Sequence, residues 1–421
     1  MQCLLKIAKK FFLEVFEMIN TEITVYGKTL PNRVVFQPME GCDCKANGDI
    51  DELTRRRYLR FAQSGASIIW FEATAVCEEG RSNPRQAWLT EETLPSYKAL
   101  VAEMKSVSRD LYGYEPLVII QLNHSGRHAK PTGKPEPKVV YRNEVYEKGK
   151  EDQPYDVLSD ERIDLIPAMY AKSAALAVEA GFDGIDVKCC HGYFMNEFLS
   201  AYEREGKYGG SFENRTRLYF DCIDAVKAAI PENIFITTRL SGYDGFPYPY
   251  GYGCSKNKEI DFEEPKKIIA KLLEKGIELI NITIGNPYVI PHVNRPFMGG
   301  PEKGEIGVER VRYVTDTLQH AFPEAKIIMS ALTYPGVKAM DFAEECLEKG
   351  TCSMVGFGRM TFAYPQFFQD YLKTGTLDPK KVCIKCGNCS KMMRAGSVAG
   401  CPVRDKEVYM PIYKKAMESV K

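Results

Sequence analysis

The sequence predicts an α/β fold, a (β/α)8 TIM barrel with a short C-terminal cysteine-rich segment. Four times a helical stretch ends at a glycine and a nearly continuous apolar run follows, at Gly65, Gly181, Gly276 and Gly350. Glycine is a common left-handed helix stop, and a strand buried on both faces needs such a run. Eight strands alternating with helices favour a closed barrel over an open doubly wound sheet, which stays as the alternative.

The elements follow in chain order. Predicted strands occupy 32–39, 66–76, 116–122, 182–189, 234–241, 277–285, 326–332 and 351–359. Helical patterns lie between them, such as 160–180, with Ser159 as the expected N-cap, and 261–275. We therefore expect an N-terminal extension over 1–20, the barrel over 21–375 and an iron–sulfur-binding segment over 376–421.

The extension at 1–20 has apolar residues at helical spacing with charged residues between them, which predicts an amphipathic helix. Docking on a membrane surface, packing on the body of the protein and a start codon placed too early are its three interpretations.

Composition excludes several classes of protein. The chain has 421 residues with 56 Lys and Arg against 56 Asp and Glu, so no basic excess points to nucleic acid. No run approaches the ~20 apolar residues of a membrane span. Disulfide-rich secreted proteins are short and carry a signal peptide, so the 14 cysteines indicate a reduced, cytoplasmic protein.

Polar residues gather where predicted strands end, which in a barrel is the catalytic face. Of the five histidines, all but His320 lie just beyond strand ends. The polar set is Glu40, Gln121, Asn123, His124, His128, Lys188, His191, Arg239, His292 and Arg359.

The strongest local motif is C-terminal. Cys383, Cys386 and Cys389 are each separated by two residues, and Cys401 follows with Pro402 behind it. This spacing is typical of ligands to a [4Fe–4S] cluster. Structural zinc also uses four cysteines, usually as two separated pairs, and is the weaker alternative.

A phosphate site is the second signal, although no GxGxxG or P-loop motif occurs. The loops after strands seven and eight carry small residues at Ser330–Leu332 and at Gly356 and Gly358, with Arg359 adding charge. Barrels commonly hold a phosphate between these two loops.

Several longer motifs, in order from about residue 22 to 370, carry a resemblance. They include NRVVFQPMEG (32–41), QLNHSGR (121–127), HGYFMNEFLSAYE (191–203), YGGSFENRTR (208–217) and VGFGR (355–359). The chain resembles the old yellow enzyme family of FMN-dependent barrels. Its cysteine motif resembles the subgroup containing bacterial 2,4-dienoyl-CoA reductase, which implies FMN, a [4Fe–4S] cluster and hydride transfer to an activated C=C bond.

The resemblance also implies roles for single residues. Gln121 would bind the flavin pyrimidine, and Arg239 would stabilise the reduced flavin near N1 and O2. The full set of cofactor-binding candidates is Pro38, Met39, Glu40, Ala73, Gln121, Arg239, Ser330, Ala331, Leu332, Gly358 and Arg359.

Tyr193 takes the place of the tyrosine that protonates the substrate in the reductase subgroup. Lys188 and His191 stand where classical members have a His/Asn or His/His pair that holds the substrate carbonyl, so the anchor differs here. His292 comes a few residues later than the relay histidine of the subgroup. Two residues separate the second and third cysteines, where the subgroup has three.

These observations predict an FMN-dependent ene-reductase acting on a small unsaturated substrate, an enone, enoate or enoyl thioester. The chain stops about 20 residues past Cys401, so we expect electrons from NAD(P)H directly or from a separate ferredoxin or flavoprotein. One alternative is an amine dehydrogenase or demethylase that passes electrons to the cluster. Another is a zinc-stabilised barrel that binds a phosphorylated ligand without redox activity. A homo-oligomer is also compatible with the sequence.

Overall fold

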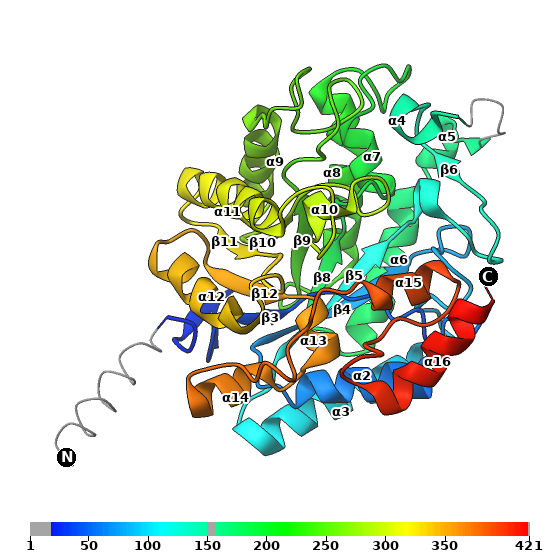
Figure 1. Cartoon of the computed structure of the whole chain (residues 1–421). Helices are drawn as coiled ribbons and strands as arrows, with labels where there is room; N and C mark the ends of the chain where they lie inside the picture. Colours follow the sequence, from blue (N-terminus) through cyan, green and yellow to red (C-terminus); the bar gives the residue numbers. More distant parts are fainter. Residues whose placement is uncertain (1–17, 150–155, 420–421) are drawn as a thin grey trace, which may run out of the picture.

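The computed structural model describes residues 18–149 and 156–419, and eight parallel strands close into a barrel (Figure 1). Each strand pairs with the next along the chain, and the last pairs with the first. The strands are β3 (Val34–Phe36), β4 (Ile68–Ala75), β5 (Leu117–Asn123), β8 (Gly184–Val187), β9 (Phe235–Ser241), β10 (Leu279–Thr283), β11 (Lys326–Met329) and β12 (Met354–Phe357). All eight predicted strands and the predicted TIM barrel are confirmed. The predicted helix within 1–20 lies largely outside the described residues.

A helix follows every strand and packs on the outside of the barrel. These helices are α2 (Glu52–Ala62), α3 (Leu94–Tyr112), α6 (Ile166–Glu179), α8 (Phe212–Ala229), α9 (Glu263–Glu274), α11 (Gly304–Ala321), α12 (Ala339–Glu348) and α14 (Phe367–Thr374). The predicted helix over 160–180 is in fact two helices, α5 (Asp160–Ile163) and α6. Pro167 explains the division, because proline fits the first turn of a helix but not its interior. Ser159 precedes α5, although its side chain caps no backbone N–H.

The remaining elements lie in the loops and in the C-terminal part. The loops carry β6 (Lys138–Val139), α4 (Glu144–Glu147), β7 (Asp156–Val157), α7 (Phe194–Leu199), α10 (Pro291–Asn294), and the short 3-10 turns at Gly126–His128 and Gly336–Lys338. The C-terminal part contains α13 (Arg359–Ala363), α15 (Asn388–Arg394) and α16 (Lys406–Glu418).

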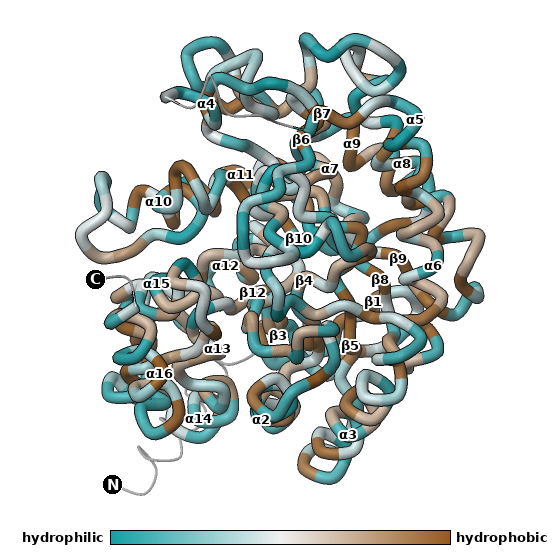
Figure 2. Tube along the Cα trace, turned by 90° about the vertical axis from the view of Figure 1, so that its right-hand side faces the viewer, coloured by the Kyte–Doolittle hydropathy of each residue, from teal (hydrophilic) through white to brown (hydrophobic). Residues whose placement is uncertain are grey.

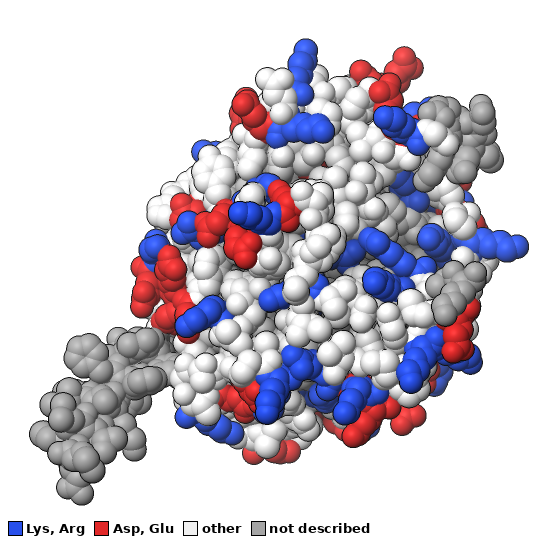
Figure 3. Space-filling model, in the orientation of Figure 1, with Lys and Arg blue, Asp and Glu red and all other residues white. Residues whose placement is uncertain are grey.

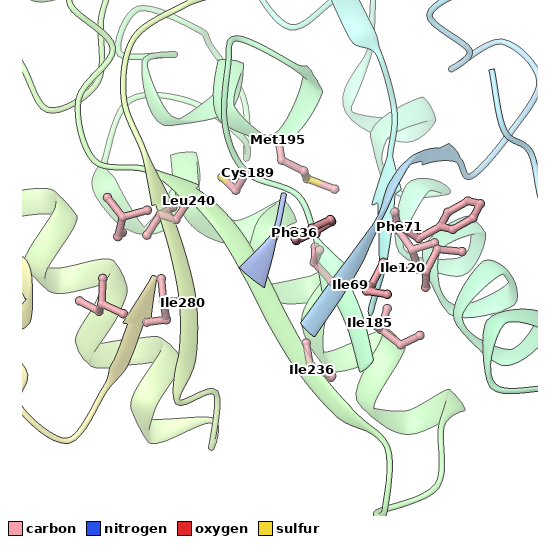
Figure 4. Close-up of a cluster of buried hydrophobic side chains, with 14 of the residues drawn as sticks. Phe36, Ile69, Phe71, Ile120, Ile185, Cys189, Met195, Ile236, Leu240 and Ile280 are labelled. Atoms are coloured by element: carbon pink, nitrogen blue, oxygen red, sulfur yellow. The ribbon is translucent and has the colours of Figure 1, made fainter. Parts of the chain in front are cut away.

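Two layers of apolar side chains hold the barrel together. The larger layer fills the space between strands and helices, where Phe36, Ile69, Phe71, Ile120 and Ile185 are buried (Figure 4). Brown apolar residues accordingly run along the strands in Figure 2, while teal residues cover the loops.

The second layer lies inside the barrel and includes Trp70, Ile119 and Leu279. Residues of the hairpin formed by β1 (Ile23–Val25) and β2 (Lys28–Leu30) belong to this cluster and cover the amino-terminal end of the barrel. The site is therefore left to the carboxyl end.

The cysteine-rich segment packs against the barrel through its own contacts. Asp405 accepts hydrogen bonds from Arg56, at 2.7 Å, and from Arg60, both on α2. Ala399 N–H donates to the carbonyl of Gly41 at 2.6 Å. No helix in the described part of the chain is long and apolar enough to cross a membrane.

Candidate active site

One large cavity opens at the carboxyl ends of the barrel strands, with about 1210 Å³ of empty space that is partly open to solvent. Ten of the eleven predicted cofactor-binding residues line it, as do three of the four predicted catalytic residues. The predicted residues along its wall are Pro38, Met39, Glu40, Ala73, Gln121, Lys188, His191, Tyr193, Arg239, Ser330, Ala331, Gly358 and Arg359.

A buried carboxylate organises one wall of this cavity. Asp186 on β8 accepts hydrogen bonds from Trp70 Nε1 at 2.8 Å, Gln121 Nε2 at 2.7 Å and the backbone N–H of Arg239 at 2.8 Å. Burial raises the pKa of Asp186 to about 6, and the donated bonds oppose that rise. Because the amide nitrogen of Gln121 is held by Asp186, its carbonyl oxygen remains available to accept from a ligand N–H.

Arg239 supplies the complementary donor. Its Nε is buried and has no hydrogen-bond partner, and the side chain lines the cavity. A buried donor without a partner costs free energy of about 1–3 kcal/mol. A bound acceptor, such as the N1 and O2 edge of a flavin, would remove that cost. Sequence reasoning missed Asp186, although a lone acid within the apolar run of β8 was a signal.

The loops after β11 and β12 form one corner of the cavity. Ala331 has a positive φ of 67°, a conformation that is uncommon for a residue with a Cβ. Such a turn lets successive N–H groups face one ligand. Thr333 Oγ1 accepts from the N–H of Met360 at 3.2 Å and so ties the two loops together. Small residues and Arg359 at this corner fit a phosphate group.

Two tyrosines meet on another part of the wall. Tyr193 and Tyr288 place their hydroxyl oxygens 2.5 Å apart. Tyr193 is buried, whereas Tyr288 is 41% exposed and stacks on His128 with ring centroids 3.7 Å apart. Lys188 Nζ lies 3.5 Å from the centre of the Tyr193 ring. Burial, followed by neighbouring Tyr288, holds the pKa of Tyr193 well above its usual range, so the phenol keeps its proton.

His191 is held as a neutral imidazole. Its Nε2 lies 2.8 Å from Asn294 Nδ2 and 3.0 Å from Thr283 Oγ1. Burial first, and then the charges of Arg239 and Lys188, keep the pKa of His191 well below its usual range. Because an amide nitrogen donates to Nε2, the ring proton belongs on Nδ1.

The structure places three other predicted residues away from the cavity. His292 is the second residue of α10, whose last residue, Asn294, lines the cavity together with Arg295 just after the helix. His292 is two residues earlier, about 200° around a helix, and does not line the wall. His124 is buried and does not line the cavity, and burial lowers its pKa to about 3. Leu332 is buried in the core and does not line the cavity.

The four motif cysteines surround a smaller hollow of about 360 Å³. Cys383, Cys386, Cys389 and Cys401 all line it, and none forms a disulfide. Among the described residues, ligand atoms within 4.8 Å of one another come from Cys77, Glu79 and His124, and the motif cysteines do not form such a group. Zn–S bonds of about 2.3 Å would put the sulfurs about 3.8 Å apart. No three of the motif sulfurs are as close together as one zinc ion would hold them, and four thiols around one hollow are also the ligand set of a [4Fe–4S] cluster.

The main cavity is strongly cationic. Lys188, Arg239, Arg295, Arg359 and Arg394 line it against one carboxyl group, Glu40, whose pKa is raised by burial. Burial, followed by the charges of Arg359 and Arg394, lowers the pKa of Arg295 to about 10. A bound anion would relieve this repulsion. Arg295 and Tyr288 were not among the predicted site residues.

Comparison with solved structures supports the fold over nearly the whole chain. 2-Naphthoyl-CoA reductase superposes with a TM-score of 0.75 over 95% of this chain and 58% of its own, at 20% identity. Histamine dehydrogenase from Rhizobium sp. 4-9 gives 0.70 over 93% of this chain and 53% of its own, at 17% identity. The chain thus spans little more than half the length of either protein. The old yellow enzyme homologue of Zymomonas mobilis gives 0.64 over 86% and 95% of the two chains, at 20% identity.

Sequence comparison gives the family. NADH:flavin oxidoreductase FG08077 of Gibberella zeae is 26% identical over 350 residues, which are 79% of this chain and 80% of that protein. The NADPH dehydrogenase of Listeria monocytogenes (serovar 1/2a, strain ATCC BAA-679 / EGD-e) is 31% identical over 293 residues, 68% and 80% of the two chains. The model of one protein family matches residues 19–376, nearly the whole barrel and its flanks. With the resemblance to old yellow enzymes thus confirmed, the chain belongs to the NADH:flavin oxidoreductase / NADH oxidase family of flavin-dependent oxidoreductases.

Proposed function

We propose that the chain is an FMN-dependent ene-reductase that reduces an activated C=C bond, with residues 21–375 holding the flavin and 376–421 holding a [4Fe–4S] cluster. The observation that carries the proposal is the Tyr193–Tyr288 contact of 2.5 Å in the same cavity as the Gln121–Asp186–Arg239 network. A buried, protonated phenol supplies an acid, and the network supplies a cradle for a flavin.

The residues present fit FMN. Gln121 offers an acceptor and Arg239 an unpartnered donor, which match the N–H and carbonyl groups of an isoalloxazine edge. Ser330, Ala331, Gly358 and Arg359 provide the corner for its phosphate. When bound, reduced FMN supplies a hydride to the β-carbon of the substrate.

The chain's own residues then polarise and protonate the substrate. His191 Nδ1–H, and Lys188 where it is charged, can donate to the oxygen of the activating group. Burial lowers the pKa of Lys188, and the charge of Glu40 partly restores it. Tyr193 gives its proton to the α-carbon, and Tyr288, whose hydroxyl lies 2.5 Å from that of Tyr193, can restore that proton.

The cysteine hollow supports the second cofactor. Cys383, Cys386, Cys389 and Cys401 would bind the cluster through their thiolates. Cys389, Arg359 and Phe362 line both this hollow and the main cavity, so the two proposed cofactor sites adjoin. The cluster would carry electrons between an external donor and the flavin. NAD(P)H is the donor that the family supports for the flavin itself.

An amine dehydrogenase is the second candidate. Histamine dehydrogenase matches 93% of this chain in structure. Such an enzyme would run electrons in the opposite direction, from substrate to cluster.

One anaerobic preparation tests these candidates. The visible spectrum and assays of flavin, iron and acid-labile sulfide report the cofactors. Turnover of an enone with NADPH, compared with oxidation of an amine with an artificial acceptor, reports the direction. A colourless protein with zinc and no sulfide would establish the non-redox barrel and exclude both enzymes.

A further inference from the structure

We propose that the basic surface around Cys386 is the docking site of an acidic one-electron carrier protein, such as an acidic ferredoxin. The inference rests on the proposed [4Fe–4S] cluster and names the kind of partner that exchanges electrons with it. The basic surface is defined by Lys385, Lys391 and Arg394, with Lys380 and Lys406 at the ends of the same segment.

The segment around the cysteines departs from the charge balance of the chain. Residues 379–406 contain seven Lys and Arg against one acid, Asp405, whereas the whole chain has 56 of each kind. Asp405 is already paired with Arg56 and Arg60 on α2. The local positive charge is therefore not cancelled within the segment.

These cations are available to a partner. Lys380, Lys391, Arg394 and Lys406 are exposed, and none of them, nor Lys385, forms an ion pair with a carboxylate of the described residues. Figure 3 shows Lys and Arg side chains gathered around α15 on this face, while red carboxylates lie mainly farther out. Clustered positive charge on a protein surface steers the approach of an oppositely charged protein and raises the association rate.

The proposed cluster reaches the surface at the same place. Cys386 is the one exposed member of the four motif cysteines. It lies between Lys385 and Gly387, whose φ values of 59° and 73° make a tight left-handed turn. Electron transfer weakens steeply with distance, so a carrier seated here would approach the cluster at its most accessible ligand.

Apolar groups complete the surface. Ile384 is 39% exposed and Val337 is 38% exposed. Lys385 Nζ lies 3.3 Å from where a Cβ on Gly336 would be, so the 336–338 turn adjoins the cysteine loop. A few apolar groups with a charged rim are typical of weak redox encounters, which bury less than about 1,200 Å².

The proposed cluster site lies between the basic surface and the main cavity, and the electrons of the proposed transfer balance. Cys389 lines both hollows, so the surface, the cluster site and the cavity follow one another. Two reduced carriers each give up one electron, and these two electrons with one proton from solvent equal the hydride that the C=C reduction consumes. The second proton comes from Tyr193, and both carriers leave oxidised.

Charge reversal tests the surface in the full-length holoenzyme. The probe is an acidic bacterial ferredoxin, whose Kd in its oxidised form is measured at low and high salt. Lys385→Glu with Lys391→Glu should raise that Kd at least tenfold and flatten its salt dependence. Lys98→Glu, at an exposed position on α3, is the matched control and should change the Kd less than twofold. The single Lys391→Glu variant serves if the double variant loses iron.

The outcomes separate the two proposals. Wild-type protein without iron would refute the cluster, and therefore the proposed function in part, whatever the Kd shows. Protein with full iron whose Kd is the same in the double variant and the control would overturn the docking surface alone. Loss of NADPH-driven flavin reduction in the double variant would also overturn it, because the lysines would then bind a nucleotide.

Discussion

Replacing Tyr193 by Phe removes one oxygen from the proposed proton donor and keeps the ring. The ring contact with Lys188 Nζ at 3.5 Å can persist, because it uses the aromatic face. The lost hydroxyl has one described hydrogen-bond partner, the hydroxyl of Tyr288. Tyr288 is 41% exposed and can bond to water instead, so the free energy of unfolding should fall by only about 0.5–1.5 kcal/mol.

The effect on catalysis should be much larger than the effect on stability. A positioned general acid contributes about 10²–10⁴ in rate, which corresponds to about 2.7–5.4 kcal/mol of activation free energy. The loss should fall on one half of the reaction. Hydride transfer from NADPH to the flavin does not use the acid, whereas reoxidation of the flavin by an enone does.

Anaerobic stopped-flow absorbance separates the two halves. We expect Tyr193→Phe to reduce its flavin at the wild-type rate and to reoxidise it 10²–10⁴ times more slowly. Because the pKa of Tyr193 is raised, its neutral, proton-donating form prevails up to well above pH 9, and the wild-type reoxidation rate should be flat between pH 6 and 9. An unchanged reoxidation rate in the variant would refute the assignment of Tyr193. Tyr288→Phe is the companion variant, with a smaller loss if water can replace it as the proton source.

Three further predictions concern the cofactors and the barrel. Asp186→Asn leaves one acceptor oxygen for three buried donors, so the amide of Gln121 loses its orientation. An unsatisfied buried donor costs about 1–3 kcal/mol, and FMN affinity measured by fluorescence titration should therefore fall roughly 5- to 150-fold. Unaltered affinity would show that Asp186 does not orient Gln121. Cys386→Ser should lower the iron and sulfide content without removing flavin, and zinc in the wild-type protein would contradict the cluster. Gln37 exchanges two amide hydrogen bonds with Asn281, at 3.1 and 2.8 Å. Gly356→Ala would place a Cβ 1.9 Å from Gln37 Nε2, so urea denaturation should show a loss of about 1–3 kcal/mol in the free energy of unfolding. Wild-type stability would mean that this amide pair can move aside.

The sequence predicts the barrel well because buried parallel strands must be apolar on both faces. The run IIWFEATA on β4 and the run LVIIQLN on β5 are visible without any knowledge of their neighbours. Charged or amide residues inside such runs, such as Arg239 and Gln121, are conspicuous for the same reason. Both line the cavity.

Residues on loops are harder to predict, because no periodicity fixes where they point. The expected relay histidine, His292, lies in the short helix α10, and Asn294 at its end and Arg295 just after it line the cavity instead. Tyr288, four residues earlier, meets Tyr193 across 95 positions of sequence. The only available signal was its place shortly after β10, where the related reductases have a functional residue. Asp186 was missed because its partners come from three different strands.

The hydrogen bonds from Arg56 and Arg60 of α2 to Asp405 affect what happens to the protein when oxygen destroys the proposed cluster. Together with the Ala399–Gly41 backbone bond and the small core of Met392, Val398 and Tyr409, they hold the cysteine segment without any help from iron. A molecule that has lost its proposed cluster should therefore keep α16 and the residues around Cys401 docked on the barrel. Repair then becomes a matter of supplying iron, sulfide and a reductant to an intact scaffold, with no step of refolding.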